Sequence, residues 1–285
     1  MKFEKIGVLG AGIMGSGIAQ VAAQAGFQVV MRDIDERFVN GGLDAIDRFL
    51  TRSVEKQKIT QDEKKGILGQ IRGTVSMEEM GGADFVIEAV LEDLELKKRV
   101  FAELDRLCRP EVILTSNTSS MSITEIAAAT GRPERVAGMH FFNPAPLMKL
   151  VEVVRGFQTS DETLQAVTDL TKKMGKEPVQ VKKDSPGFIV NRVLMPHFIE
   201  AIRLVEEGVA SMEDVDKAVK LGLNYPMGPF ELMDLTGIDI FSHVTEYFFR
   251  ELNRENKWVA PQLMKTMIRA NRLGRKTKAG WYEYE

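Results

Sequence analysis

The chain has little cysteine and little histidine: one cysteine and three histidines among 285 residues. The single cysteine, Cys108, excludes an internal disulfide, and no cysteine and histidine cluster has metal-ligand spacing. The 38 Lys and Arg residues nearly balance the 41 Asp and Glu residues, which gives a net charge of -3 and no sign of a nucleic-acid surface. Function must therefore come from local sites, and we expect no metal.

Long apolar runs are also missing. None approaches the length of a membrane-spanning helix, so we expect no membrane partner. The first expected strand begins within a few residues of Met1, which leaves no room for a signal or transit peptide. The expected setting is the cytoplasm.

Near the N-terminus, an apolar strand at 5–9 runs directly into a glycine-rich turn that opens a helix. Gly10 allows the tight turn, Gly12 lets the backbone approach a pyrophosphate, and Gly15 lets helix and strand pack closely. The helix N-terminus offers unpaired N–H groups to the anion. The pattern predicts a dinucleotide site built from Gly10, Ala11, Gly12, Ile13, Met14 and Gly15.

The second expected strand, residues 27–33, ends in an acid, Asp33, at about the distance from the turn that dinucleotide sites show. A carboxylate there accepts hydrogen bonds from the adenosine ribose hydroxyls and would repel a 2′-phosphate. The sequence therefore favours NAD over NADP. Arg32 precedes the acid and could turn toward a phosphate, which keeps NADP as the alternative.

Strands and helices alternate along the first two thirds of the chain and only helices follow. We expect further strands at 83–90, 112–116, 136–142, 150–154 and 178–181, and helices at 36–57, 62–70, 94–107, 122–130 and 161–174. After Lys183 we expect helices at 188–207, 239–251 and 261–273. This order predicts a Rossmann-type, doubly wound α/β domain with a mostly parallel sheet at 1–183 and an all-helical domain at 184–285.

The three histidines have different contexts. His140 ends the strand 136–142, and ligands of open parallel sheets bind beyond the carboxyl ends of the strands. His197 and His243 lie within expected helices, where a histidine usually packs or faces water. His140 is therefore the candidate general base.

Glu152 is an acid in an otherwise aliphatic strand, 150–154. A buried carboxylate is costly without a partner. If the partner is His140, the carboxylate would fix the imidazole tautomer and stabilise the imidazolium. Alternatively, Glu152 lies on an exposed face of its strand. The spacing of the two residues leaves both possibilities open.

Two polar segments also point to the ligand-binding rim. Residues 116–120 follow a buried strand, and their hydroxyls and amide suit a polar ligand or the cap of the next helix. Asn191 falls in the first turns of the helix 188–207, close to the domain junction, where its amide could donate to a carbonyl.

With these residues assembled, the chain resembles the short-chain L-3-hydroxyacyl-CoA dehydrogenases, most closely their bacterial 3-hydroxybutyryl-CoA branch. The resemblance covers nearly the whole length. It is carried by the glycine-rich turn and by residues 116–120, 140–144, 148–152, 184–192 and 225–230. No catalytic motif departs from the family pattern.

The resemblance implies His140 as base and Glu152 as its partner, with Ser119 and Asn191 arranging the substrate. Lys56 matches a lysine that contacts coenzyme A, although it could also be a solvated lysine on a charged helix. Positions matching the family's cofactor residues, beyond the turn and Asp33, are Glu92, Lys97, Ser119, Asn143 and Lys276.

The implied activity is the reversible NAD-linked oxidation of an (S)-3-hydroxyacyl-CoA to the 3-oxoacyl-CoA. Acyl chains of butyryl length are the expected substrates. A homodimer formed through the helical domain is also expected. Two other functions remain open: a sugar-acid dehydrogenase of the gulonate type, and a nucleotide-binding structural protein without turnover.

Overall fold

The computed structural model describes residues 3–285. It divides into two compact units, Met1–Ser185 and Pro186–Glu285. The first unit ends at Ser185, whereas the sequence predicts that the first domain ends at Lys183. No helix among residues 3–285 has both the length and the apolar character needed to cross a membrane.

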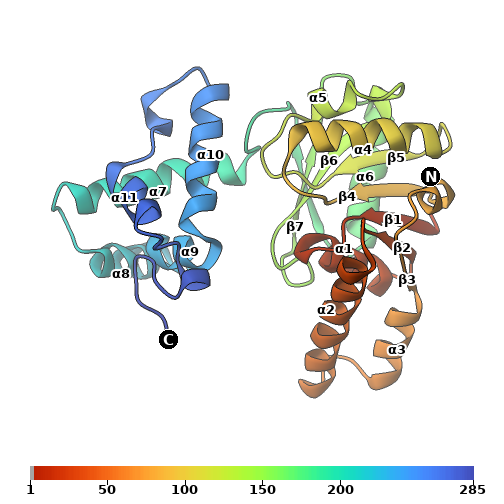
Figure 1. Cartoon of the computed structure of the whole chain (residues 1–285), viewed down its shortest axis with the longest axis horizontal. Helices are drawn as coiled ribbons and strands as arrows, with labels where there is room; N and C mark the ends of the chain where they lie inside the picture. Colours follow the sequence, from red (N-terminus) through yellow and green to blue (C-terminus); the bar gives the residue numbers. More distant parts are fainter. Residues whose placement is uncertain (1–2) are drawn as a thin grey trace. The chain divides into compact units, whose positions relative to one another are not determined.

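The first unit is built on an eight-stranded sheet, counted over the described residues, with the order β3-β2-β1-β4-β5-β6-β7-β8 (Figure 1). The strands from β3 through β6 are parallel, β7 is antiparallel to β6, and β8 is parallel to β7. The mostly parallel, doubly wound sheet is confirmed. The strands are β1 (Lys5–Leu9), β2 (Gln28–Arg32), β3 (Ile71–Thr74), β4 (Phe85–Glu88), β5 (Ile113–Ser116), β6 (Val136–Phe141), β7 (Leu150–Val154) and β8 (Glu177–Val181).

Helices cover both faces of this sheet. Ile18 of α1, Leu50 of α2 and Val167 of α6 share one apolar core with residues of the strands, so these helices lie on the same face. The other face carries α4, whose Lys97 is bonded to a β4 side chain, and α5, which packs on β6. The helical elements are α1 (Ile13–Gln24), α2 (Glu36–Glu55), α3 (Gln61–Gly69), η1 (Glu78–Gly82), α4 (Leu94–Leu107), α5 (Ile123–Ala127), η2 (Pro133–Arg135) and α6 (Asp161–Lys173).

Strand β3 is the one element of the sheet that the sequence pattern missed. It has four residues, one of them Gly73, and it pairs only with β2 at the edge of the sheet. An added Cβ at Gly73 would collide with Val39 of α2, so the glycine lets that helix lie close to the strand. A short strand with a glycine and little alternation carries no strand signal of its own.

The second unit is helical, with only isolated β-bridges in its tail. Its core gathers large aromatic side chains, including Phe198, Phe230, Phe248, Trp258 and Trp281. The second domain is therefore all-helical, as expected, although the helix suggested at 261–273 ends earlier. The elements are α7 (Val190–Glu206), α8 (Met212–Leu223), α9 (Pro229–Thr236), α10 (Ile238–Glu251), η3 (Asn256–Trp258), α11 (Gln262–Arg269) and η4 (Arg275–Thr277).

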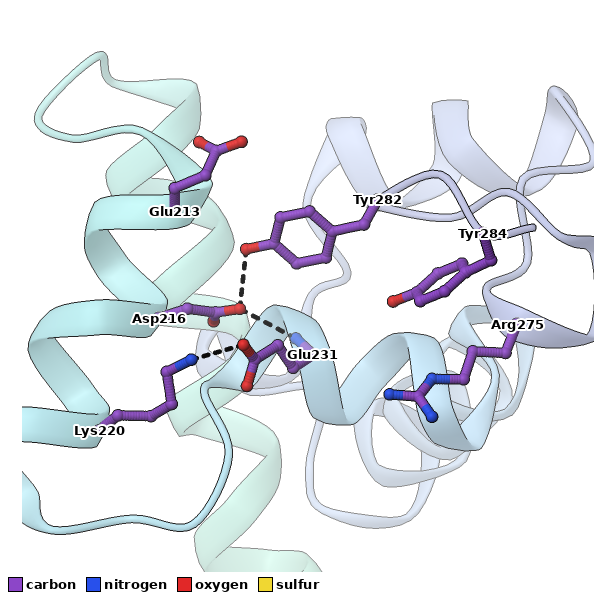
Figure 2. Close-up of a pocket in the computed structure, with 7 residues that line it drawn as sticks. All are labelled: Glu213, Asp216, Lys220, Glu231, Arg275, Tyr282 and Tyr284. Carbon is purple, nitrogen blue, oxygen red and sulfur yellow. Dashed lines mark hydrogen bonds and ion pairs between the residues drawn. The ribbon is translucent and has the colours of Figure 1, made fainter.

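Two buried acids fasten the C-terminal tail onto the second unit. Asp216 of α8 accepts hydrogen bonds from the Phe230 N–H, at the start of α9, and from the Tyr282 hydroxyl. Asp234 of α9 accepts from the Tyr282 N–H and the Tyr284 hydroxyl. Figure 2 shows Tyr282 reaching from the tail to Asp216, beside the ion pair of Lys220 with Glu231. These bonds hold the last residues of the chain in place.

Candidate active site

The glycine-rich turn joins β1 to α1 at the point where the strand order reverses, between β2 and β4. Gly10 has φ +103°, and an added Cβ would collide with the Ala89 carbonyl. At Gly15 an added Cβ would collide with the Gly10 carbonyl. Gly15 therefore lets the helix α1 lie close to the turn, rather than to the strand as predicted. At Gly12 nothing lies within 4 Å of an added Cβ, and no side chain caps α1. Open space before uncapped N–H groups fits a pyrophosphate.

Asp33 lies directly beside this turn. Its Oδ2 accepts a hydrogen bond of 2.7 Å from the Ala11 N–H, and its Oδ1 accepts one of 2.7 Å from the Ile34 N–H. These bonds fix the carboxylate next to the turn. The Arg32 guanidinium donates to the Val75 carbonyl at 3.2 Å, which directs it toward the β3 edge. The geometry suits a carboxylate that accepts from ribose hydroxyls.

His140 and Glu152 are direct partners across β6 and β7. The antiparallel register sets the two residues opposite each other, and Nδ1 of His140 lies 2.7 Å from Oε2 of Glu152. Their exposed fractions are 5% and 0%. The alternative of an exposed Glu152 is therefore wrong. A buried carboxylate bonded to one ring nitrogen fixes the orientation of the imidazole.

A second buried acid, Glu88, ends β4. Its Oε1 accepts hydrogen bonds from the Val90 N–H and the Lys97 Nζ, both at 2.7 Å, and its Oε2 accepts one of 2.6 Å from the Ser116 hydroxyl. Both Glu88 and Lys97 are almost completely buried. The Lys97 ammonium also lies 3.3 Å from Oε2 of Glu92.

Glu92 connects this ion pair to the loop after β5. Its Oε1 accepts from the Thr118 hydroxyl at 2.6 Å, from the Ser119 N–H at 2.8 Å and from the Ser119 hydroxyl at 3.1 Å. Burial acts to raise the pKa of Glu92, but the charge of Lys97 and the hydrogen bonds from Thr118 and Ser119 hold that pKa below its usual value. Glu92 is therefore ionised at neutral pH.

These polar groups share one face of the sheet. The alternate residues of the same strands, such as Phe85 and Met139, belong to the apolar core on the opposite face. Glu88, His140 and Glu152 consequently point to the face of α4 and α5. Because β4, β5 and β6 are parallel, their polar carboxyl ends reach the same edge of the sheet.

The suggested role of residues 116–120 as the cap of the next helix is wrong, because the N-cap residue lies after this segment. The Thr118 hydroxyl accepts from the Met121 N–H and so shapes the turn before α5, although the N-cap of α5 is Ser122. Asn117 accepts from the Phe141 N–H at 2.8 Å and ties β5 to the end of β6. Ser119, bonded to Glu92, is half-buried in this loop.

The other expected site residues lie in different places. Asn143 is exposed just after β6, and Lys56 is the exposed C-cap residue of α2. In the second unit, Asn191 lies in the first turn of α7, and Lys276 of η4 forms an ion pair with Asp239.

The remaining histidines lie on helices of the second unit. His197 packs near Tyr225, with ring centroids 5.9 Å apart, and burial lowers its pKa; His243 is exposed on α10. Both positions fit the expectation that a histidine in a helix packs against neighbours or faces water.

Glu88 is the residue of this region that the motif-based prediction missed. The signal was present, because Glu88 is an acid at the end of an apolar strand, as Glu152 is an acid within one. Because a buried carboxylate is costly without a partner, the same argument predicts a partner for Glu88.

Among the described residues, no group of His, Cys, Asp and Glu is arranged to hold a metal ion.

Comparisons with known proteins give a consistent picture. Residues 5–185 match the family model described as 3-hydroxyacyl-CoA dehydrogenase, NAD binding domain, and residues 187–284 match the C-terminal domain of the same family. The chain is 48% identical to the probable 3-hydroxybutyryl-CoA dehydrogenase of Bacillus subtilis, over all of this chain and 99% of the relative. It is 44% identical to the mitochondrial hydroxyacyl-coenzyme A dehydrogenase of Sus scrofa, over 99% of this chain and 91% of the relative.

A solved structure is similar along the whole chain. The crystal structure of (S)-3-hydroxybutyryl-CoA dehydrogenase from Ralstonia eutropha superposes with a TM-score of 0.96 at 44% identity. The match covers 100% of both chains.

Proposed function

This chain belongs to the 3-hydroxyacyl-CoA dehydrogenase family, and we propose that it catalyses the reversible NAD-dependent oxidation of (S)-3-hydroxybutyryl-CoA to acetoacetyl-CoA. The observation that carries the proposal is the buried hydrogen bond between His140 and Glu152 at the carboxyl edge of a dinucleotide-binding sheet. The butyryl chain length is supported by the names of full-length relatives from Bacillus subtilis and Clostridioides difficile.

The first unit offers the groups that would hold NAD. The turn from Gly10 to Gly15 would receive the pyrophosphate, and Asp33 would accept from the adenosine ribose. Glu92, which the family resemblance assigns to the cofactor and which is bonded to Ser119, would lie at the nicotinamide end. The family resemblance adds Lys97, Ser119, Asn143 and Lys276 to this set. When bound, NAD supplies the hydride acceptor of the reaction.

His140 would act as general base on the substrate hydroxyl. Because Nδ1 is bonded to Glu152, Nε2 is the nitrogen that takes the proton. The buried carboxylate then stabilises the imidazolium through a charge-assisted bond, in surroundings with little water to screen the attraction. In the reverse direction the same imidazolium returns its proton to the oxygen of the 3-oxo group.

Three further side chains are proposed to position the substrate. Ser119 and Asn191 would hydrogen-bond the acyl group, in keeping with the resemblance described above. Ser119 is held by Glu92 and so has a defined orientation. Lys56 is exposed, as a lysine contacting the phosphates of coenzyme A would be.

The test is the spectrophotometric oxidation of NADH by the wild-type protein with acetoacetyl-CoA, compared with sugar-acid substrates. We expect turnover with the acyl-CoA and little with the sugar acids. Preferential turnover of a sugar acid would replace the proposed substrate. Absence of turnover together with NADH binding would instead favour the non-catalytic, nucleotide-binding alternative.

A homodimer formed through the second unit is part of the proposal. Large apolar side chains remain exposed there, among them Leu221 and Leu223 of α8. Light scattering during size-exclusion chromatography should give twice the chain mass of 31.9 kDa. A monomer at micromolar concentration would contradict this assembly. We also propose a cytoplasmic setting, which cell fractionation tests.

A further inference from the structure

Glu88 is a buried acid that the proposed chemistry does not use. It is 0% exposed, and it receives three hydrogen bonds, from Val90, Lys97 and Ser116. A fully buried ion pair such as that of Glu88 with Lys97 gains little net stability, because removing both charges from water offsets their attraction. Its presence therefore calls for a reason other than stability.

The position of the Lys97 ammonium supplies that reason. It lies between two carboxylates, 2.7 Å from Oε1 of Glu88 and 3.3 Å from Oε2 of Glu92. Glu88 is anchored in β4 by its other bonds, whereas Glu92 lies in the connection before α4 with its side chain 39% exposed. The buried acid therefore fixes the lysine, and the lysine in turn fixes the accessible acid.

Glu92 passes this constraint on to Ser119. Its Oε1 accepts hydrogen bonds from Thr118 and Ser119, and its Oε2 lies beside the Lys97 ammonium. A shift of the ammonium toward Glu92 would move both oxygens. The bonds thus connect Glu88 in the sheet, through Lys97 and Glu92, to Ser119 at the carboxyl edge.

We propose that Glu88 is a positioning residue for the cofactor: by fixing the Lys97 ammonium, it keeps Glu92 and Ser119 in the arrangement that receives the nicotinamide end of NAD. This inference rests on the proposed function, since it takes NAD as the ligand of Glu92. Glu88 itself touches no ligand and acts only through Lys97.

The test is a fluorescence titration with NADH on the Glu88→Gln variant, together with its melting temperature. Glutamine keeps the shape of the side chain but removes its charge, so the Lys97 ammonium is drawn to the remaining carboxylate of Glu92. We expect the Kd for NADH to rise about tenfold, which corresponds to about 1.4 kcal/mol of binding free energy.

Asp105→Asn is the matched control. Asp105 forms a largely buried ion pair with Arg132 in the same unit, 2.6 Å between Oδ1 and Nε, and neither residue belongs to the proposed site. We expect this variant to melt earlier and to bind NADH with the wild-type Kd. A purely structural role of Glu88 would give the same pattern for Glu88→Gln and would overturn the proposal.

A second variant covers the case in which Glu88→Gln does not fold. The double variant Glu88→Gln with Lys97→Met removes both buried charges together, which is better tolerated than removing one. It also leaves Glu92 without its cation, so the Kd for NADH should rise at least as much. A wild-type Kd in either folded variant refutes the positioning role.

The binding measurements also separate this inference from the proposed function. A wild-type protein that binds NADH but does not turn over acetoacetyl-CoA fails the functional proposal. The comparison of Kd values among the variants still decides the role of Glu88.

Discussion

At the scale of single residues, His140 is the group whose loss should affect chemistry more than binding. We expect His140→Gln to lower kcat by about a hundredfold or more, because no other base would take the hydroxyl proton, and to leave the Kd for NADH nearly unchanged. Steady-state kinetics and NADH titration measure the two effects. His197→Gln and His243→Gln are the controls and should stay within a few-fold of the wild-type kcat. Near-normal turnover by His140→Gln would remove the proposed base.

Substitution of Glu152 tests whether it acts together with His140. Glu152→Gln keeps the shape and one acceptor but removes the charge that stabilises the imidazolium, so kcat should fall substantially while the fold survives. Because the two residues act as a unit, His140→Gln combined with Glu152→Gln should be little worse than His140→Gln alone. Multiplied losses in the double variant would show independent roles. A melting curve for each variant separates lost chemistry from lost folding.

Asp33 governs the choice between the two nicotinamide cofactors. We expect the wild-type protein to use NADH far better than NADPH, because the Asp33 carboxylate would repel a 2′-phosphate, and Asp33→Ala should narrow the gap. The ratio of kcat/KM for the two cofactors measures this preference. Preference for NADPH in the wild type would instead assign Arg32 a phosphate-binding role, despite its bond to the Val75 carbonyl.

At the scale of elements, the junction of β1 with α1 predicts different effects on stability for two glycines. Gly15→Ala would drive a methyl group into the Gly10 carbonyl, so it should lower the melting temperature and weaken NADH binding together. Gly12→Ala meets no protein atom and has φ −68°, so it should keep the wild-type melting temperature and still weaken NADH binding. Thermal melts and NADH titrations distinguish them. Wild-type affinity in Gly12→Ala would mean that no pyrophosphate lies at this position.

The antiparallel return of β7 is the element-scale feature that makes the site. A parallel β7 would not place Glu152 opposite His140 in this register, and a slip by one residue would turn the carboxylate to the apolar face. The strands themselves were predictable from their apolar runs. Their relative direction depends on the path of the connection 142–149, which no periodicity of the strand residues encodes.

At the scale of the whole molecule, the fastening of the C-terminal tail predicts a loss of stability at alkaline pH. Burial, and then the hydrogen bond to Asp234, raises the pKa of Tyr284 to about 12 from 10.0. Burial and the bond to Asp216 also raise the pKa of Tyr282. A raised folded-state pKa contributes stability that is fully present below pH 10 and is lost as the pH rises toward 12. Unfolding of the second unit should therefore become easier across this window.

Tryptophan fluorescence can follow this unit separately, because both tryptophans of the chain, Trp258 and Trp281, belong to its core. Tyr284→Phe is the control: it loses the bond to Asp234 at every pH, so it should be less stable than the wild type at neutral pH and less sensitive between pH 10 and 12. Equal alkaline sensitivity in both proteins would rule out Tyr284 as a source of the effect.

The sequence by itself determined the features that rest on neighbouring residues. The glycine-rich turn, Asp33 at the end of the second strand, the alternation of strands and helices, and the helical last third all follow from local steric and apolar patterns. His140 could be singled out because few histidines compete with it and because it ends a strand. The roles of these residues stay predictions that the variants above test.

Only the tertiary structure decided which polar groups meet. The bond between His140 and Glu152, the ion pair of Glu88 with Lys97, and the fastening of the tail by Asp234 join residues 9 to 50 positions apart in sequence. The sequence showed that a buried acid needs a partner but could not name it. The partner depends on strand direction, register and helix placement, which the packing of the whole unit sets.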